Sequence, residues 1–202
     1  MSDFTYETEN RMNKYETYEW DNIWIEHANE IGRKRAAYIG DSISVGTRRI
    51  ATARTNEEIL FDGFGTSKAL DNPYFKDSIR LFFKQLPNVD TVLFNNGLHG
   101  WHLNDETEYK VLYDEMIQFI LSEIKGARLY ILLITAVENN EDNKRVKIRN
   151  TAAREVAEKY SIPVIDLYDV VSANINEISH DGIHPTEPLY EKIADEIIRN
   201  IG

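Results

Sequence analysis

A serine at the end of a short apolar run is the first group in the chain that could do covalent chemistry. Residues 36–39 have the length and apolar content of a buried strand, Gly40-Asp41-Ser42 is typical of a tight turn, and residues 45–53 can continue as a helix. Ser42 would then stand at a helix N-terminus, where backbone N–H groups point at any anion that forms in front of them. The alternative is that Asp41 or Ser42 only caps a helix.

An aspartate and a histidine near the other end of the chain could activate that serine. Asp181 precedes His184 by three residues, in a turn that Gly182 and Pro185 favour. This spacing can place the carboxylate beside imidazole Nδ1 while Nε2 faces outward, which gives a nucleophilic serine its base and the orienting group of that base. Asp-x-x-His alone is a weak pattern, because a histidine in a polar turn is more often a surface residue. Together with the Gly-Asp-Ser turn it becomes specific.

These two motifs resemble the first and last blocks of the SGNH or GDSL-type hydrolases, and the resemblance covers residues 35–202. It implies a three-layer α/β/α flavodoxin-like fold whose central sheet has five parallel strands in the order 2-1-3-4-5. It also implies ester hydrolysis through an acyl-enzyme, with Ser42 as nucleophile, His184 as base and Asp181 as the partner of the base. Such a mechanism requires neither a cofactor nor a metal.

The resemblance further implies an oxyanion hole, in which the Ser42 amide is joined by donors from two more blocks. The second block supplies a glycine N–H after the second strand, and Gly65 has the favoured position. The third block is normally Gly-x-Asn-Asp, and aligning the glycines puts His99 where the family has its asparagine. A histidine can donate from a ring N–H, so His99 is the first candidate. The alternatives to these two donors are Gly63, Asn95 and Asn96.

Trp101 and His102 follow the third block and are candidate substrate-lining residues. Loops with aromatic, histidine and amide side chains suit stacking on a sugar and hydrogen bonding to it. We therefore expect removal of a short acyl group, an acetyl above all, from a small polar or carbohydrate ester. Within the same family, the alternative is a lysophospholipase or thioesterase.

Two readings from other classes stay open. In the first, a site of oxygen and imidazole ligands holds a metal ion for the hydrolysis of phosphate esters. Its ligands would be Asp41, His99, Asp181 and His184. In the second, the altered third block marks a catalytically degenerate protein that binds an acylated ligand or a partner.

Composition limits the partners of the protein. The 202 residues carry a formal net charge of -11, which argues against general electrostatic binding to nucleic acid or to an anionic membrane. The absence of cysteine excludes disulfides, thiolate metal sites and cysteine nucleophiles. The sequence shows no signal peptide and no apolar run near the ~18 residues of a membrane span, so a cytoplasmic location is expected.

Residues 1–34 are expected to form an extension with an amphipathic helix, in front of a hydrolase domain at residues 35–202. Apolar residues recur there at helical spacing, and Gly32 fits a C-cap. These residues are Trp20, Ile23, Trp24, Ala28 and Ile31. The two tryptophans need a partner. The helix either packs against the body of the same domain, contacts a second copy in a homo-oligomer, or forms a lid over the site.

Strands and helices alternate after Ser42, which predicts a parallel sheet with right-handed crossovers and helices on both faces. The further strands are expected at 58–61, 91–95, 129–135 and 163–166, and the helices at 79–86, 105–124, 144–160 and 188–201. Ligands of such sheets bind beyond the carboxyl ends of the strands. All candidate residues follow strands directly or lie in the last loop, so they are expected at that one edge.

Overall fold

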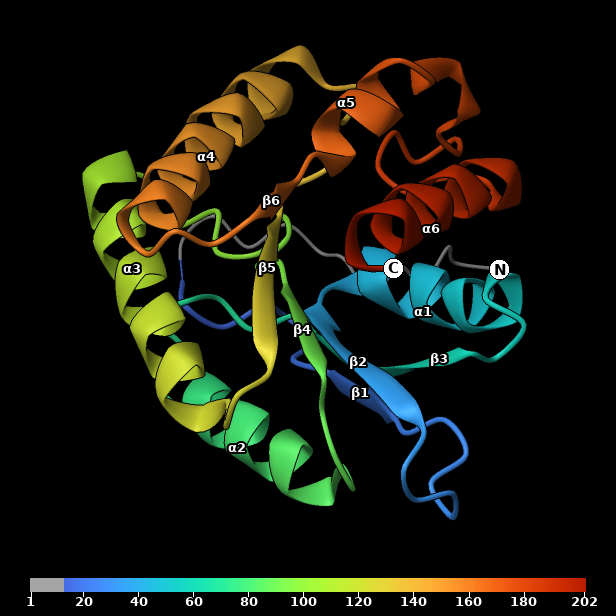
Figure 1. Ribbon diagram of the computed structural model, residues 1–202. Helices are drawn as coiled ribbons and strands as arrows, with labels where there is room; N and C mark the ends of the chain where they lie inside the picture. Colours follow the sequence, from blue (N-terminus) through green and yellow to red (C-terminus); the bar gives the residue numbers. More distant parts are fainter. Residues whose placement is uncertain (1–12) are drawn as a thin grey trace.

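Six strands form the central sheet of the computed structural model, which describes residues 13–202 (Figure 1). The strands are β1 (Asp21–Trp24), β2 (Lys34–Gly40), β3 (Ile59–Thr66), β4 (Thr91–Phe94), β5 (Arg128–Leu132) and β6 (Val164–Ile165). Their order is β1-β3-β2-β4-β5-β6, and β2 to β6 are parallel. The expected five-stranded parallel sheet in the order 2-1-3-4-5 is confirmed.

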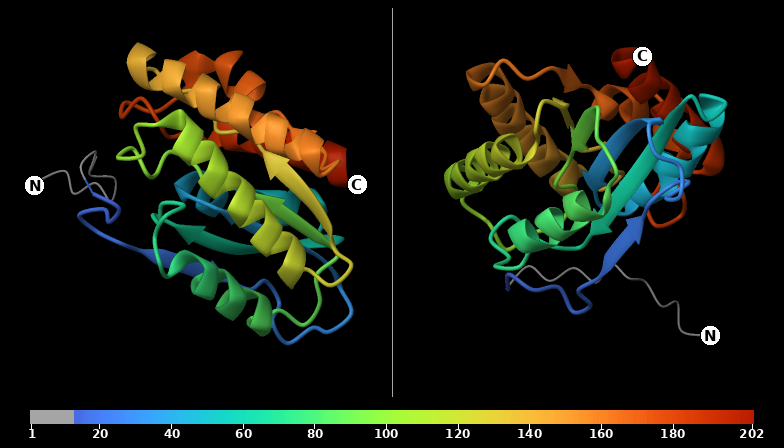
Figure 2. Two further views of the ribbon diagram at one scale, coloured as in Figure 1. Left: turned by 90° about the vertical axis from the view of Figure 1, so that its left-hand side faces the viewer. Right: turned by 60° about the horizontal axis from the view of Figure 1, so that its bottom comes forward.

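The helices lie in two layers, one on each face of the sheet (Figures 1 and 2). They are α1 (Ser42–Arg54), α2 (Phe75–Gln85), α3 (Glu106–Glu123), α4 (Asn140–Lys159), α5 (Leu167–Ser172) and α6 (Glu187–Ile201), with a short 3-10 helix, η1 (Ile175–Glu177), before α6. Side chains of α2, α3 and α4 pack on one face, and those of α1, α5 and α6 pack on the other. The three-layer architecture is therefore confirmed.

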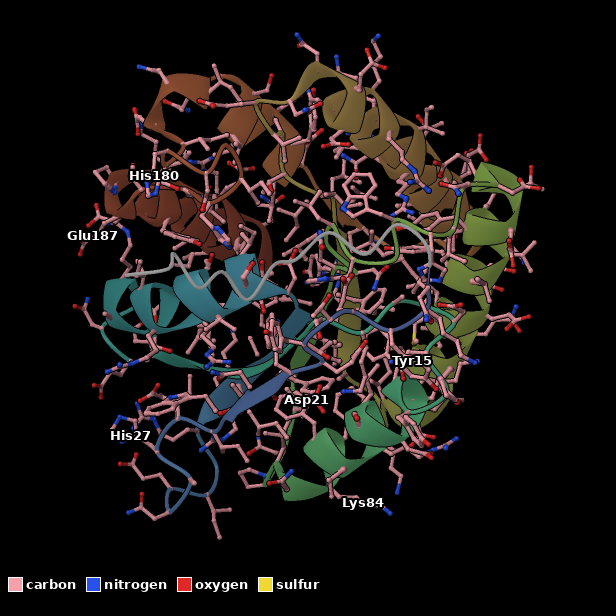
Figure 3. The ribbon with its side chains drawn as sticks, turned by 180° about the vertical axis from the view of Figure 1, so that it is seen from behind. Tyr15, Asp21, His27, Lys84, His180 and Glu187 are labelled. Carbon is pink, nitrogen blue, oxygen red and sulfur yellow. The ribbon has the colours of Figure 1, made fainter. Side chains whose placement is uncertain are left out.

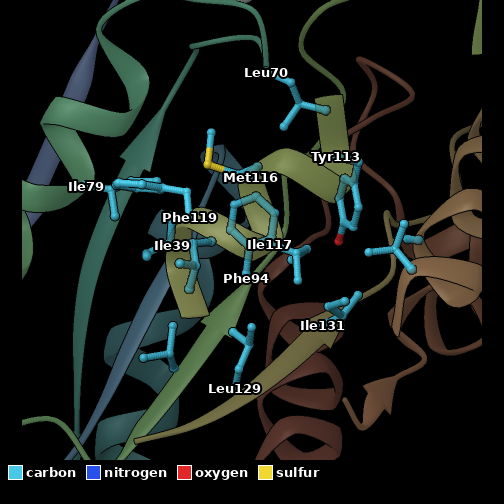
Figure 4. Close-up of a cluster of buried hydrophobic side chains, with 14 of the residues drawn as sticks. Ile39, Leu70, Ile79, Phe94, Tyr113, Met116, Ile117, Phe119, Leu129 and Ile131 are labelled. Carbon is cyan, nitrogen blue, oxygen red and sulfur yellow. The ribbon is translucent and has the colours of Figure 1, made fainter. Parts of the chain in front are cut away.

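The pleat of β2 divides the core between the two faces. Ala37 and Ile39 point into the cluster under α2, α3 and α4, while Ala36 and Tyr38 point into the cluster under α1, α5 and α6. Figure 4 shows the first cluster, in which Ile39 and strand residues of β4 and β5 meet side chains of α3. Burying a large apolar side chain contributes roughly 1.5–3 kcal/mol, so a strand buried on both faces is held firmly in register.

The predicted N-terminal helix is wrong, because residues 21–24 form β1, an edge strand antiparallel to β3. The apolar spacing fits a helix, but β3 would otherwise leave a row of N–H and C=O groups unpaired, and β1 satisfies them. Ile23 and Trp24 lie on this exposed strand, and Ile31 lies in a turn and is 86% exposed. The helix on which the expected homo-oligomer contact depended is absent, so that contact stays an untested prediction.

β1 belongs to the same sheet as the rest of the chain, and the domain boundary placed at residue 34 stays a prediction. Residues 1–12 of the expected extension lie outside the described part. None of the helices within residues 13–202 has the length and apolar character needed to cross a bilayer.

Candidate active site

Ser42 is the first residue of α1, at the corner where β2 ends. Asp41 caps the helix, since its carboxylate accepts a hydrogen bond of 2.9 Å from the Ile43 N–H. The Ser44 hydroxyl donates to the Asp41 carbonyl at 2.7 Å and fixes the turn. Ser42 is half-buried, and its amide belongs to the first turn of α1, whose N–H groups have no acceptor within the helix. The predicted strand-to-helix corner is therefore confirmed.

The structure brings the predicted serine, histidine and aspartate together in one hydrogen-bonded chain. His184 Nε2 lies 2.9 Å from Ser42 Oγ, and His184 Nδ1 lies 2.7 Å from Asp181 Oδ2. The two ring nitrogens thus face the hydroxyl on one side and the carboxylate on the other. In this arrangement the imidazole can take the serine proton while the carboxylate stabilises the resulting charge.

The second carboxylate oxygen of Asp181 is held by its own loop. Oδ1 accepts hydrogen bonds from the backbone N–H groups of Ile183 and His184, both at 2.9 Å, and from the Ser179 hydroxyl at 2.8 Å. Partial burial alone would raise the pKa of the Asp181 carboxyl. The hydrogen bonds from the two N–H groups, the His184 ring and Ser179 outweigh that effect and hold the pKa well below its usual range. Asp181 is therefore a carboxylate at any pH near neutral.

Two backbone contacts fix the loop that carries Asp181 and His184. The Ser179 N–H donates to the His184 carbonyl at 2.7 Å, which closes the turn. The Glu138 N–H donates to the Gly182 carbonyl at 3.0 Å and ties this turn to the loop between β5 and α4. Gly182 has φ +75°, a conformation that favours glycine. The loops before α4 and α6 are therefore joined at one end of the molecule, and Figure 2 shows the loop before α3 at the same end.

The third block touches the serine turn directly. The Leu98 N–H donates to Asp41 Oδ2 at 3.4 Å. Gly97 has φ +69°, and a Cβ atom at this position would lie 1.9 Å from Asp41 Oδ2. Only glycine therefore allows the third block to approach the capping aspartate this closely.

Two arginines of α4, which the sequence analysis missed, clamp the loop after Gly97. Arg149 is buried and donates to the carbonyls of His99 at 3.1 Å and Gly100 at 2.7 Å. Arg145 donates to the Trp101 carbonyl at 2.6 Å and also to that of Leu103. Nothing in the helical pattern of residues 144–160 marks these two arginines, because their acceptors are backbone groups some 40 to 50 residues away.

The sheet register turns the second-block glycines away from the serine. The Ser67 N–H donates to the Trp20 carbonyl at 3.2 Å, and Gly65 is paired with Asn22. Because N–H directions alternate along a strand, the amides of Gly65 and its alternative Gly63 also face β1. The register thus argues against Gly65 as an oxyanion donor. Gly65 instead leaves room for α1 to pack closely on β3, because a Cβ at this position would lie 2.3 Å from a methyl carbon of Val45.

Among the third-block candidates, both asparagines bind backbone groups. The Asn95 side-chain amide donates to the Leu132 carbonyl at 2.9 Å, and that of Asn96 donates to the Lys68 carbonyl at 3.3 Å. The first bond joins the ends of the neighbouring strands β4 and β5, and the second joins the end of β4 to that of β3, across β2. His99 is buried, and its ring lies 3.5 Å from Glu16, measured from Nδ1 to Oε1. Of the three, His99 has the side chain that lines the neighbouring cavity.

A cavity of about 200 Å³ lies next to His99 and Asp181, and neither Ser42 nor His184 is among its described lining residues. The described residues around it are Glu16, Leu98, His99, Trp101, Val137, Asn139, Asp142, Asp181, Gly182 and Ile183. Three of them are acidic, and within residues 13–202 no lysine or arginine lines the cavity. Carboxylates are thus the most numerous charged groups among the described lining residues, and His99 is the basic residue among them.

Trp101 lines the cavity as predicted, whereas His102 is not among the described lining residues. His102 Nε2 lies instead 3.0 and 3.1 Å from the two carboxylate oxygens of Asp71. His180, which neighbours Asp181 in the sequence, is exposed on the outer loop near α6 (Figure 3). Glu16 was not predicted, because nothing in the polar N-terminal stretch distinguishes it from the other glutamates there.

The four ligands of the alternative metal reading are not assembled into a metal site. Within the described chain, no group of three or more histidine, aspartate or glutamate side chains is placed to hold a metal ion. The Asp41 carboxylate instead accepts from the N–H groups of Ile43 and Leu98.

Comparison with known proteins finds similarity to solved three-dimensional structures but no matching family model or curated sequence. No protein-family model and no curated protein sequence matches the chain. A member of the lipolytic G-D-S-L family from Veillonella parvula is 17% identical, with a TM-score of 0.66 over 83% of this chain and 98% of its own. An acetylxylan esterase from Geobacillus stearothermophilus is 13% identical, with a TM-score of 0.63 over 85% of this chain and 95% of its own.

A carbohydrate acetylesterase from Sinorhizobium meliloti is 12% identical, with a TM-score of 0.64 over 83% of this chain and 100% of its own. Each of these likenesses spans nearly the whole of the other protein. At such identities the likeness concerns the backbone. The chain therefore has the fold of the SGNH or GDSL-type hydrolases.

Proposed function

We propose that the protein is a serine ester hydrolase that removes a short acyl group, acetyl above all, from a small polar or carbohydrate substrate. The observation that carries the proposal is the chain from Ser42 Oγ through His184 to Asp181, with distances of 2.9 and 2.7 Å. Acetyl esterases stand among the proteins with this fold, which supports the choice of substrate.

The proposed reaction proceeds in two halves. His184 Nε2 takes the Ser42 proton as Oγ attacks the ester carbonyl carbon, and His184 then gives that proton to the leaving alcohol. Water attacks the acyl-enzyme in the second half, and the same imidazole takes its proton and returns it to Ser42 as the acid leaves. Asp181 holds the ring with Nδ1–H toward the carboxylate and stabilises the charged ring in both halves.

The negative charge on the tetrahedral intermediate needs donors beside Ser42. We assign the Ser42 amide, at the N-terminus of α1, and a ring N–H of His99 to this role. The Gly65 amide has no part in this assignment, since the sheet register directs it to β1.

The cavity supports a small, uncharged substrate. Its volume of about 200 Å³ suits a short acyl group with part of an alcohol. Asn139 and Asp142 bring polar side chains to the cavity wall, where the Asn139 amide nitrogen can donate to a hydroxyl group while its Oδ1 caps α4, and Trp101 offers an apolar surface. Lysophospholipids and acyl carriers with phosphate groups would bring anions to acidic walls, so these alternatives are disfavoured. The intact hydrogen-bonded chain likewise favours an enzyme over a degenerate binding protein.

The test is hydrolysis of p-nitrophenyl esters from acetate to decanoate, together with acetylated xylo-oligosaccharides. Wild type should act best on acetate, Ser42→Ala should lose nearly all activity, and a chelator should leave the rate unchanged. A folded wild-type protein that hydrolyses none of these esters would contradict the proposal. Activity that survives Ser42→Ala and disappears with the chelator would favour the metal reading.

A further inference from the structure

We propose that Glu16 is a positioning residue that orients the His99 ring and favours its charged form, so that the ring presents an N–H donor to the reacting ester. The inference rests on the proposed function, because it concerns the donor that stabilises the intermediate. It gives the N-terminal segment before β1 a part in the site, although the sequence motifs all lie after residue 40.

Glu16 is the one residue between positions 13 and 19 that is not exposed. Its side chain is 10% exposed, that of His99 is 8% exposed, and both line the cavity. Glu16 Oε1 lies 3.5 Å from His99 Nδ1. A carboxylate turned inward from a polar segment is costly unless an opposite charge or donor meets it, and His99 is such a group.

The segment that carries Glu16 is anchored to the sheet. The Trp20 N–H donates to the Ser67 hydroxyl at 2.9 Å, and β1 follows at once. The Trp20 ring meets the His99 ring edge-on, with 6.1 Å between the centroids. Figure 3 labels Tyr15 and Asp21, which flank this segment. Glu16 and Trp20 thus both contact His99, and the indole sets the plane against which the imidazole packs.

Arg149 already fixes the backbone of His99, so what must be decided is which ring nitrogens carry a hydrogen. A carboxylate 3.5 Å from Nδ1 favours a hydrogen on that nitrogen. In the neutral ring with Nδ1–H, Nε2 would be an acceptor and could not stabilise an oxyanion. The negative charge of Glu16 favours the doubly protonated ring, whose Nε2–H can donate. A charged donor would then replace the neutral amide of the family's asparagine.

A double-mutant cycle tests this coupling. Glu16→Gln should lower kcat about 10-fold or more on p-nitrophenyl acetate with little change in KM, because the donor acts on the intermediate. In a His99→Asn background, where the amide needs no charge, Glu16→Gln should change kcat less than about 2-fold. Glu16→Asp should retain part of the activity. Asp71→Asn, which removes the carboxylate beside His102 outside the cavity lining, is the matched control and should keep wild-type kcat.

A titration of the histidines by NMR gives a second readout that needs no turnover. The chain has five histidines, and His99→Asn assigns the His99 signal. Its midpoint should be lower in Glu16→Gln than in wild type. Both proteins keep Arg149, which binds the His99 carbonyl, and Asp142 and Asp181, which line the same cavity.

The outcomes separate the two proposals. An inactive wild type, or one indifferent to Ser42→Ala, overturns the proposed function, and the titration still decides whether Glu16 sets the state of His99. An active wild type with full kcat in Glu16→Gln overturns only the present inference. Equal losses in both backgrounds would also overturn it, since they would show a structural effect that does not pass through His99. Equal titration midpoints of His99 in wild type and in Glu16→Gln would also overturn the inference.

Discussion

At the scale of single residues, we expect Asp181 to hold His184 in the orientation and protonation state that the reaction needs. Its carboxylate accepts two backbone N–H groups, a hydroxyl and the His184 ring, and its pKa lies well below the usual range. Asp181 therefore stays ionised on the acid side of neutrality. The loss of activity as the pH falls should come from protonation of His184, which can then no longer accept the Ser42 proton.

We predict that Asp181→Asn lowers kcat by about 10⁴, because the ring loses the partner that fixes its tautomer.

We also predict that Asp181→Asn changes the free energy of unfolding in a way that depends on pH. The folded pKa of Asp181 is depressed, so its contribution is complete above the unfolded value of 3.8 and is lost as the pH falls toward the folded value. Urea unfolding should show wild type more stable than the variant at pH 6 and the difference shrinking below about pH 4. A difference that grows with acid would contradict this sign.

At the scale of elements, the site depends on how closely the third block approaches the serine turn. Gly97 packs against the Asp41 carboxylate, Leu98 donates to it, and Arg149 of α4 holds the carbonyls that follow. The strand ends place the serine turn and the third-block loop near each other, and these contacts between the loops set the distance between them.

We predict that Gly97→Ala lowers kcat by about 10²-fold, because a Cβ 1.9 Å from Asp41 Oδ2 must displace the turn that carries Ser42. Gly126→Ala is the matched control. Gly126 also has a positive φ, +86°, but a Cβ there meets nothing within 4 Å. Backbone strain should cost both variants roughly 1–2 kcal/mol of stability, the overlap with Asp41 should cost Gly97→Ala more, and only Gly97→Ala should lose activity. Thermal unfolding and p-nitrophenyl acetate kinetics measure the two effects, and equal kcat values would refute the steric argument.

At the scale of the whole molecule, we expect charge to influence which esters react. The chain carries a net charge of -11, and the described walls of the cavity contain three acidic residues and neither lysine nor arginine. The net charge of the chain and the carboxylates of the cavity should both disfavour an approaching anion, and the carboxylates should act at close range. A neutral ester should therefore react faster than an anionic ester of similar size.

We predict that kcat/KM for p-nitrophenyl hemisuccinate is about 10-fold below that for p-nitrophenyl butyrate at low salt. The ratio should move toward one as salt is raised, because the screening length shrinks from ~10 Å at 0.1 M to ~3 Å at 1 M. Spontaneous hydrolysis of each ester, measured without protein, is the control. A ratio that ignores salt would show that the acidic walls do not act on the substrate.

The sequence by itself determined the candidate serine, aspartate and histidine and the parallel sheet that positions them. Gly40-Asp41-Ser42 and Asp181-x-x-His184 are local patterns, and buried strands are continuous apolar runs, so both can be recognised without a partner. The spacing of Trp20, Ile23 and Trp24 fits a helix equally well, and only the unpaired edge of β3 made residues 21–24 a strand.

The tertiary structure alone decided which groups meet across long separations. The pairing of β1 with β3 turned the Gly65 amide away from Ser42, and no local pattern contains that register. The arginines of α4 bind carbonyls of the third-block loop, which have no side-chain identity to recognise. Glu16 meets His99 across more than 80 residues of chain. Local periodicity fixes where elements begin and end, whereas contacts between loops follow from packing, and packing requires the whole chain.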